Sequence, residues 1–154
     1  MTQSQLSIQN QDNEELYIPL FGYELLREHL LPGILGKDAP AILYWAGKDI
    51  ARKFPLESLD DVKAFFTKAG WGQLEVKEEK KSKLEFELES PIIAKNLKNN
   101  KDATFQLEAG FLAQQIERQK KCIAEAYESP KKRKGKVTII VQWDKHDPLD
   151  DQNE

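Results

Sequence analysis

Apolar residues in the first half of the chain recur at the three- and four-residue spacing of helices. Residues 18–36 keep this spacing until Pro32 and the glycine after it interrupt the pattern. Residues 39–54 repeat it, with Pro40 in the position of a first helical turn. Residues 58–70 begin at a serine followed by two aspartates and end at a glycine, which are helix start and stop signals. The pattern predicts three helices.

The second half of the chain changes to alternation of apolar and polar residues. Residues 73–88 alternate on both sides of the polar turn KKSK, and 122–129 and 136–144 do so on both sides of PKKRKG. Residues 91–103 indicate an irregular or short helical connection between these two hairpins. The order of helices, hairpin, helix and hairpin predicts an α+β protein, in which helices cover a twisted antiparallel sheet of about four strands.

The helix expected at residues 105–121 has two apolar faces rather than one. Its first face comprises Phe105, Ala109, Leu112 and Ile116, and its second comprises Leu107, Gly110 and Phe111. Asp102 and Thr104 are the alternative N-caps. The glycine costs about 1 kcal/mol of helix propensity relative to alanine, so it needs a reason. We expect the first face to cover the sheet and the second to meet other helices, from this chain or from a partner.

The length, composition and net charge of the chain limit how it can be organised. With 154 residues, 40% of them hydrophobic, it is long enough for one domain, which we place at residues 16–144. Residues 1–15 and 145–154 are expected to be tails, the second of them acidic. The formal net charge of -3 does not favour a nucleic-acid partner. No apolar run has the roughly 20 residues of a membrane span, and no signal peptide is visible.

Few residues suggest chemistry. The cluster KKRK at 131–134 could bind an anion, but a hairpin turn needs only solvent there. His29 has no second ligand at helical spacing, and Cys122, the only cysteine, has no CxxC context. Glu108 lies near an apolar helix face, so a buried general acid or base is the alternative to a carboxylate at the helix N-terminus. We therefore predict no catalytic, cofactor-binding or metal-ligating residue, no enzyme activity, and a cytoplasmic location.

Three stretches together resemble the YslB family of small proteins of unknown function. They are LPGILGKDAPAILYWAGKDIARKFP, FFTKAGWGQLEV and FQLEAGFLAQQIERQKKCIAEAYE, and the likeness extends over residues 17–144. This family resembles the 4-vinyl reductase-type ligand-binding domains and the subunits of the TRAPP vesicle-tethering complex. The resemblance implies a TRAPP-like fold whose helices pair in dimers, with some relatives binding an apolar molecule. The cysteines of a zinc site or of acylation in those relatives have no clear match here.

Together these observations predict a non-enzymatic, cytoplasmic module that binds an apolar small molecule or a partner protein through a helical face. The alternative is a homodimerisation module without a small-molecule ligand. The candidate residues of this ligand site or interface are Trp45, Phe66, Phe105, Leu107, Gly110 and Phe111. The competing interpretation is that they belong to the core.

Overall fold

The computed structural model describes residues 16–100, 102–129 and 135–149. This part of the chain divides between Ala39 and Pro40 into two compact units. The single domain over 16–144 stays a prediction. The expected tail at residues 1–15 lies outside the described residues. The first predicted helix therefore falls in the first unit, and the whole sheet falls in the second.

The first unit is an almost continuous helical path. It consists of α2 (Leu20–Glu24), the π-helix η1 (Leu25–Leu30), α3 (Leu31–Leu35) and the 3-10 helix η2 (Gly36–Asp38). The predicted interruption at Pro32 is wrong, since this residue lies in the first turn of α3. A proline lacks an N–H and its ring crowds the carbonyl group four residues earlier. The wider turns of η1 immediately before α3 displace those carbonyls, so the helical path continues.

Two further helices begin and end at the predicted signals. α4 (Ala39–Lys53) has Pro40 in its first turn. α5 (Leu59–Lys68) is capped by Ser58, whose hydroxyl oxygen accepts the N–H of Asp61 at 3.1 Å. Gly70 follows α5 with a φ of +73°, a conformation that glycine adopts without steric cost.

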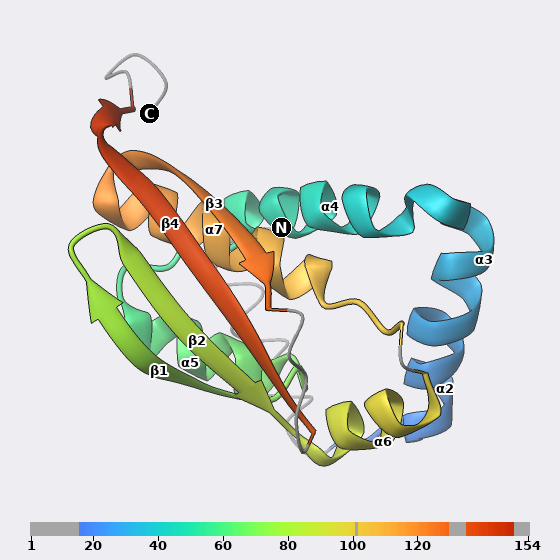
Figure 1. Cartoon of the computed structure of the whole chain (residues 1–154). Helices are drawn as coiled ribbons and strands as arrows, with labels where there is room; N and C mark the ends of the chain where they lie inside the picture. The colour runs from blue at the N-terminus through green and yellow to red at the C-terminus, as the bar shows by residue number, and fades with distance from the viewer. Residues whose placement is uncertain (1–15, 101, 130–134, 150–154) are drawn as a thin grey trace. The chain divides into compact units, whose positions relative to one another are not determined.

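Both predicted hairpins are present and form one antiparallel four-stranded sheet in the order β1-β2-β4-β3. The strands are β1 (Gln73–Lys80), β2 (Lys83–Glu89), β3 (Cys122–Glu128) and β4 (Lys136–Pro148). α6 (Pro91–Asn99) lies in the connection between the hairpins, which meet through β2 and β4. The predicted α+β class and the four antiparallel strands are confirmed (Figure 1).

The last strand is longer than its alternating pattern indicated. β4 continues to Pro148, which pairs with Cys122 of β3. Residues 145–148 are thus strand, although the sequence predicted that the acidic tail begins at 145. Residues 150–154 lie outside the described part of the chain.

The N-terminus of α7 (Gln106–Lys120) is capped from a distant strand. Neither Asp102 nor Thr104 is its N-cap, which is Phe105. The backbone N–H of Phe105 donates to a carboxylate oxygen of Glu128 at 2.9 Å. Because this carboxylate comes from β3, the local N-cap pattern in the sequence could not reveal it.

The core of the second unit lies between one face of the sheet and helices α5 and α7. Figure 1 shows both helices behind the strands. The buried strand residues on this face are Leu74, Leu84, Phe86, Leu88, Ala124, Val137, Ile139, Val141 and Trp143. Ala109, Leu112 and Ile116 of α7 are 0% exposed and belong to the same core. The prediction that this face of α7 covers the sheet is confirmed.

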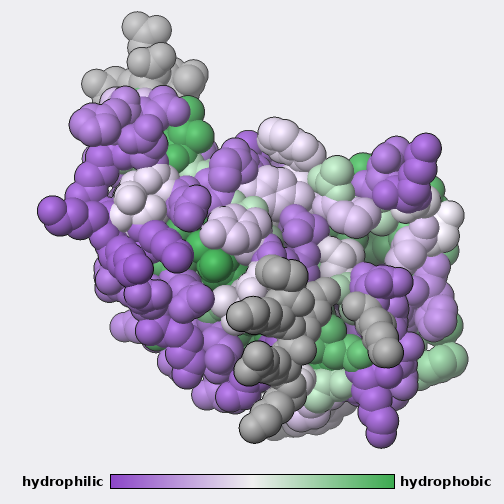
Figure 2. Space-filling model, viewed as in Figure 1, coloured by the Kyte–Doolittle hydropathy of each residue, from purple (hydrophilic) through white to green (hydrophobic). Residues whose placement is uncertain are grey.

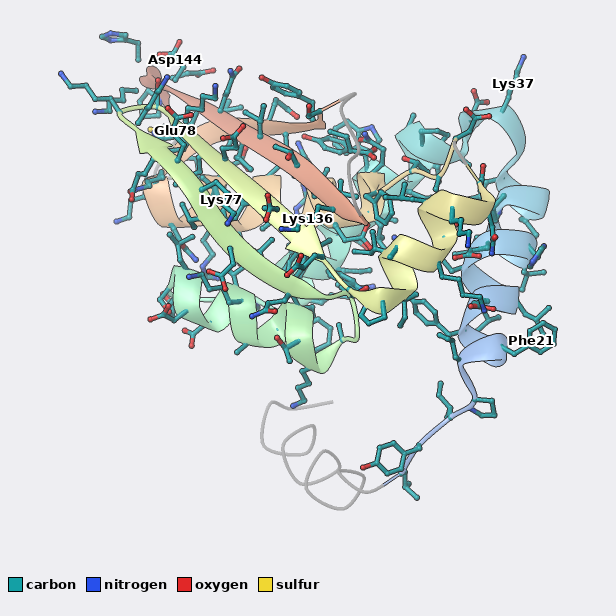
Figure 3. The ribbon with its side chains drawn as sticks, turned by 60° about the horizontal axis from the view of Figure 1, so that its bottom comes forward. Phe21, Lys37, Lys77, Glu78, Lys136 and Asp144 are labelled. Atoms are coloured by element: carbon teal, nitrogen blue, oxygen red, sulfur yellow. The ribbon has the colours of Figure 1, made fainter. Side chains whose placement is uncertain are left out.

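The opposite face of the sheet is charged and faces solvent. A carboxylate oxygen of Glu87 in β2 lies 3.5 Å from the Nζ atoms of both Lys77 and Lys136. These two lysines, labelled in Figure 3, come from the strands on either side of β2. The carboxylates of Glu87 and then Glu89 raise the pKa of Lys136. Figure 2 shows a mostly hydrophilic surface over β1 and β2. Such exposed ion pairs contribute little to stability, and the face needs no covering layer.

Candidate functional site

Three of the six candidate residues are part of the core. Phe66 and Phe111 are 0% exposed and Phe105 is 3% exposed. Side chains enclosed to this degree cannot present a surface to a partner. Their enclosure in the core of the same chain supports the competing interpretation that these three residues belong to the core.

Phe111 shows how tightly this layer is built. Its ring stacks on Phe65 with centroids 4.6 Å apart, and it meets Phe66 and Trp71 edge to face at 5.8 Å and 5.3 Å. Such aromatic pairs contribute about 0.5–1.5 kcal/mol each beyond the area they bury. The second face of α7 is therefore joined to α5 and to the turn that follows it.

Gly110 has a structural reason inside the chain. A Cβ atom at Gly110 would overlap the backbone carbonyl of Tyr44 in α4. A Cβ atom at Gly47 of α4 would in turn overlap the carbonyl oxygen of Leu107 and lie 2.8 Å from the nitrogen of Phe111. The two glycines allow α4 and α7 to cross with their backbones in contact. The expectation that Leu107, Gly110 and Phe111 meet other helices is confirmed, with α4 and α5 of this chain as those helices.

Trp45 differs from the other candidates because 63% of it is exposed. The side chain before it, Tyr44, meets it edge to face at 6.4 Å. The Nζ atom of Lys48 lies 5.0 Å from the centroid of the Trp45 ring, a distance suited to a cation–π interaction. Trp45 is thus the one candidate that offers a large aromatic surface to solvent.

Lys48 is a buried charge with named partners. It is 5% exposed, and its Nζ atom lies 3.3 Å and 3.4 Å from the carboxylate oxygens of Glu125 in β3. The hydroxyl of Tyr44 donates a short hydrogen bond to the same carboxylate. The side chain of Glu125 itself is 64% exposed. Two residues one turn apart on α4 therefore converge on a single carboxylate of the edge strand.

The same residues protect the edge of the sheet. β3 is an outer strand, and the N–H of Ala126 donates to the hydroxyl oxygen of Tyr44 at 3.0 Å. Two residues earlier, the N–H of Ala124 donates to a carboxylate oxygen of Glu117 in α7 at 3.1 Å. Alternate edge groups that another strand could use are thus occupied by side chains. Burial, followed by the hydrogen bond to Glu125, raises the pKa of Tyr44 above its ordinary value of 10.

A pocket opens beside this network. Its volume is about 270 Å³, and it is lined by Pro40, Ala41, Tyr44, Trp45, Gln106, Glu125 and Ala126. Sequence reasoning found Trp45 and missed the charged members of the site. The available signal was the spacing of Tyr44 and Lys48, which are four residues apart and so share a helix face. Nothing local to α4 indicates that Glu125, 77 residues after Lys48, completes the cluster.

The residues weighed for chemistry lie apart from this pocket. Glu108 is 1% exposed within α7, and it does not line the pocket. His29 is exposed, and Cys122 is a half-buried free thiol. Within residues 16–100, 102–129 and 135–149, no three His, Cys, Asp or Glu side chains form a group that could hold a metal ion. The basic cluster at 131–134 is outside the described residues.

Among the helices that the structure describes, none is both long enough and apolar enough to cross a bilayer.

Comparison with known proteins places the chain in a family. It is 52% identical over 136 residues to the uncharacterized protein YslB of Bacillus subtilis, a match that covers 88% of this chain and 92% of that protein. The crystal structure of a vinyl-4-reductase family protein from Methanocaldococcus jannaschii has a TM-score of 0.64 and 18% identity, covering 86% of this chain and 85% of the other. At this identity the likeness shows the fold alone. Residues 20–142 match the model of the protein family of unknown function DUF2507, and the chain belongs to that family.

Proposed function

We propose that this chain is a non-enzymatic, cytoplasmic protein-interaction module whose first unit binds a second copy through the apolar surface of α2, η1 and α3. One observation carries the proposal: these elements bury none of their residues, although they are rich in leucine. Phe21 is 64% exposed, Leu26 58% and Ile34 68%. In Figure 3 the ring of Phe21 points away from its helix.

The distribution of exposure along this segment is the reverse of an ordinary surface helix. Glu24, Arg27 and Glu28 are partly buried, whereas Leu26 and Leu30 are exposed. Large exposed apolar side chains gathered on one element mark interaction sites on proteins. The exposed residues of this segment therefore have the composition of an interface.

A second copy is a suitable partner because an apolar helix face complements itself. A twofold dimer places the same patch of both subunits in contact, so one set of leucines supplies both sides. The resemblance to domains whose helices pair in dimers supports the same partner.

The experiment compares the mass of the full chain with that of charge variants, by light scattering and by native mass spectrometry. Phe21→Glu and Leu26→Glu should each weaken dimerisation about tenfold or more, because each places a charge in an apolar contact. Lys37→Glu, which alters an exposed residue of the same segment, is the control and should leave the dimer intact. A wild-type protein that remains monomeric at high micromolar concentration contradicts the proposal.

The same exposed surface supports an alternative function, the binding of an apolar small molecule. In that case native mass spectrometry of freshly purified protein should show an added mass on a monomer. The added mass should disappear in Phe21→Glu and persist in Lys37→Glu. A ligand-free dimer favours the first function, and a liganded monomer favours the second.

A further inference from the structure

The pocket beside Trp45 lies entirely within the second unit. Its polar side chains are held in fixed directions by hydrogen bonds. The Tyr44 hydroxyl uses its hydrogen on Glu125 and accepts the N–H of Ala126. The Gln106 amide nitrogen donates to Glu128 at 2.6 Å, which turns the amide oxygen to the opposite side.

Hydrogen-bond acceptors therefore remain available around the pocket. A carboxylate has about four lone-pair positions, and Glu125 receives donors from Tyr44 and Lys48. In an antiparallel edge strand the C=O of a residue points to the same side as its N–H. The C=O of Ala126 thus points toward α4, as its N–H does. A ligand that donates hydrogen bonds fits this arrangement.

The charges around the pocket favour a cation. Two carboxylates, those of Glu117 and Glu125, accept hydrogen bonds from groups at this strand edge. Lys48 supplies one positive charge against them, and it is buried beneath Tyr44 and Trp45 rather than in the pocket lining. Glu125 and Glu117 also contribute to the raised pKa of Tyr44, as a negative field requires.

The size and shape of the pocket narrow the choice of cation. Its volume of about 270 Å³ is below the roughly 300–1,000 Å³ of sites that enclose whole small molecules. The exposed indole of Trp45 offers a flat surface on which a planar cation can stack, next to a carboxylate that can be bound at both oxygens. We propose that this pocket binds the guanidinium group of an arginine side chain presented by a partner polypeptide.

This inference goes beyond the proposed function and is independent of it, because it concerns residues of the second unit only. The test is a titration of the isotope-labelled full chain with N-acetyl-arginine amide, followed by NMR. Saturable shifts should appear at the indole N–H of Trp45, the side-chain amide of Gln106 and the backbone amide of Ala126. The Phe21→Glu variant should give the same shifts, which separates this result from any outcome for dimerisation.

N-acetyl-citrulline amide, which has nearly the same shape without the charge, should bind about tenfold or more weakly than the arginine compound. Glu125→Gln and Trp45→Ala should each weaken binding of the arginine compound by about the same factor. Trp45→Ala keeps the test valid if Glu125→Gln disturbs Lys48, since Trp45 is largely exposed. Glu57→Gln is the control, because Glu57 is an exposed carboxylate paired with Arg118 instead.

Equal binding of the citrulline and arginine compounds overturns the inference, as does unchanged binding in Trp45→Ala. Shifts that grow linearly without saturation, or that occur elsewhere on the molecule, also overturn it. Binding of agmatine, a small free guanidinium compound, without binding of N-acetyl-arginine amide contradicts a polypeptide as the source of the group.

Discussion

The two most informative helical regions of this protein reverse the usual relation between hydrophobicity and burial. The path through α2, η1 and α3 is dense in leucine, yet none of its residues is buried. α7 contains four glutamines and two glutamates, yet it buries residues on several sides, Glu108 and Gln115 among them. The difference lies in how closely other segments can approach. Gly110 and Gly47 allow backbone contact around α7, whereas the neighbourhood of Gly22 and Gly33 is open.

The largest expected effect comes from adding a side-chain atom where the backbones of α4 and α7 are in contact. Gly110→Ala should reduce the free energy of unfolding by about 5 kcal/mol or more, because the added Cβ overlaps the backbone carbonyl of Tyr44. Urea denaturation of the full chain measures the change. Gly33→Ala is the matched control in α3, where an added Cβ meets nothing within 4 Å, and it should be neutral or stabilising by up to about 1 kcal/mol. Similar losses of stability in Gly110→Ala and Gly33→Ala contradict the closer packing of α7 than of α3.

Two phenylalanines give the next test of the same contrast. Phe111→Ala should cost about 3–5 kcal/mol, since it removes a buried ring that contacts Phe65, Phe66 and Trp71. Phe21→Ala should change the stability of the monomer by no more than about 0.5 kcal/mol, since its ring is mostly exposed. Chemical denaturation at concentrations too low for association separates the two values. A large loss in Phe21→Ala indicates that this side chain is part of a core.

Gln115 tests the polar side of α7. Its amide nitrogen donates to the carbonyl of Phe54 at 2.8 Å and its amide oxygen accepts the N–H of Leu56 at 3.1 Å, so it holds the loop between α4 and α5. Gln115→Leu should cost about 2 kcal/mol by leaving both backbone groups without this partner. Gln114→Leu, one residue earlier and less buried, should cost clearly less. Equal losses indicate that the substitution acts through helix packing rather than through these hydrogen bonds.

Tyr44→Phe should have the smallest effect, about 1 kcal/mol near neutral pH, by removing the acceptor of the Ala126 N–H. Hydrogen exchange at that amide should become faster. The raised pKa means that the folded state keeps the Tyr44 proton after the unfolded state has lost it. Stability should therefore fall as the pH rises above about 10, and this extra slope should be missing from Tyr44→Phe. If stability depends on pH in the same way in the wild type and in Tyr44→Phe, the raised pKa of Tyr44 is contradicted.

Local patterns predicted most elements of this fold. Period-two alternation located both hairpins, and Ser58 and Gly70 marked the ends of α5. One error concerns a non-local partner, and the other concerns a local helix geometry that apolar spacing does not distinguish. The cap of α7 comes from Glu128, and the continuation of the helical path at Pro32 depends on the π-helical turns before it. A proline or a capping residue is interpreted from its neighbours in sequence, which cannot include a carboxylate on another strand.

The candidate site residues show the same limit of local sequence patterns. The sequence singled out Gly110 and Trp45 as unusual. Gly110 lies where α4 and α7 cross, and Trp45 is exposed and lines a pocket. The sequence grouped three buried residues with them, Phe66, Phe105 and Phe111. A phenylalanine in a core cannot be told from one on a surface by its identity alone. Only their enclosure by several elements distinguishes them.

The sequence by itself determined the class of the fold, because the periods of 3.6 and 2 follow from backbone geometry and require no knowledge of partners. It also identified the glycine at which two helices meet, because glycine within a helix has a cost that needs compensation. Only the tertiary structure decided which apolar residues are enclosed, and it brought Lys48 to Glu125 across 77 residues of chain. Burial and charge pairing depend on distances through space, and spacing along one element does not report them.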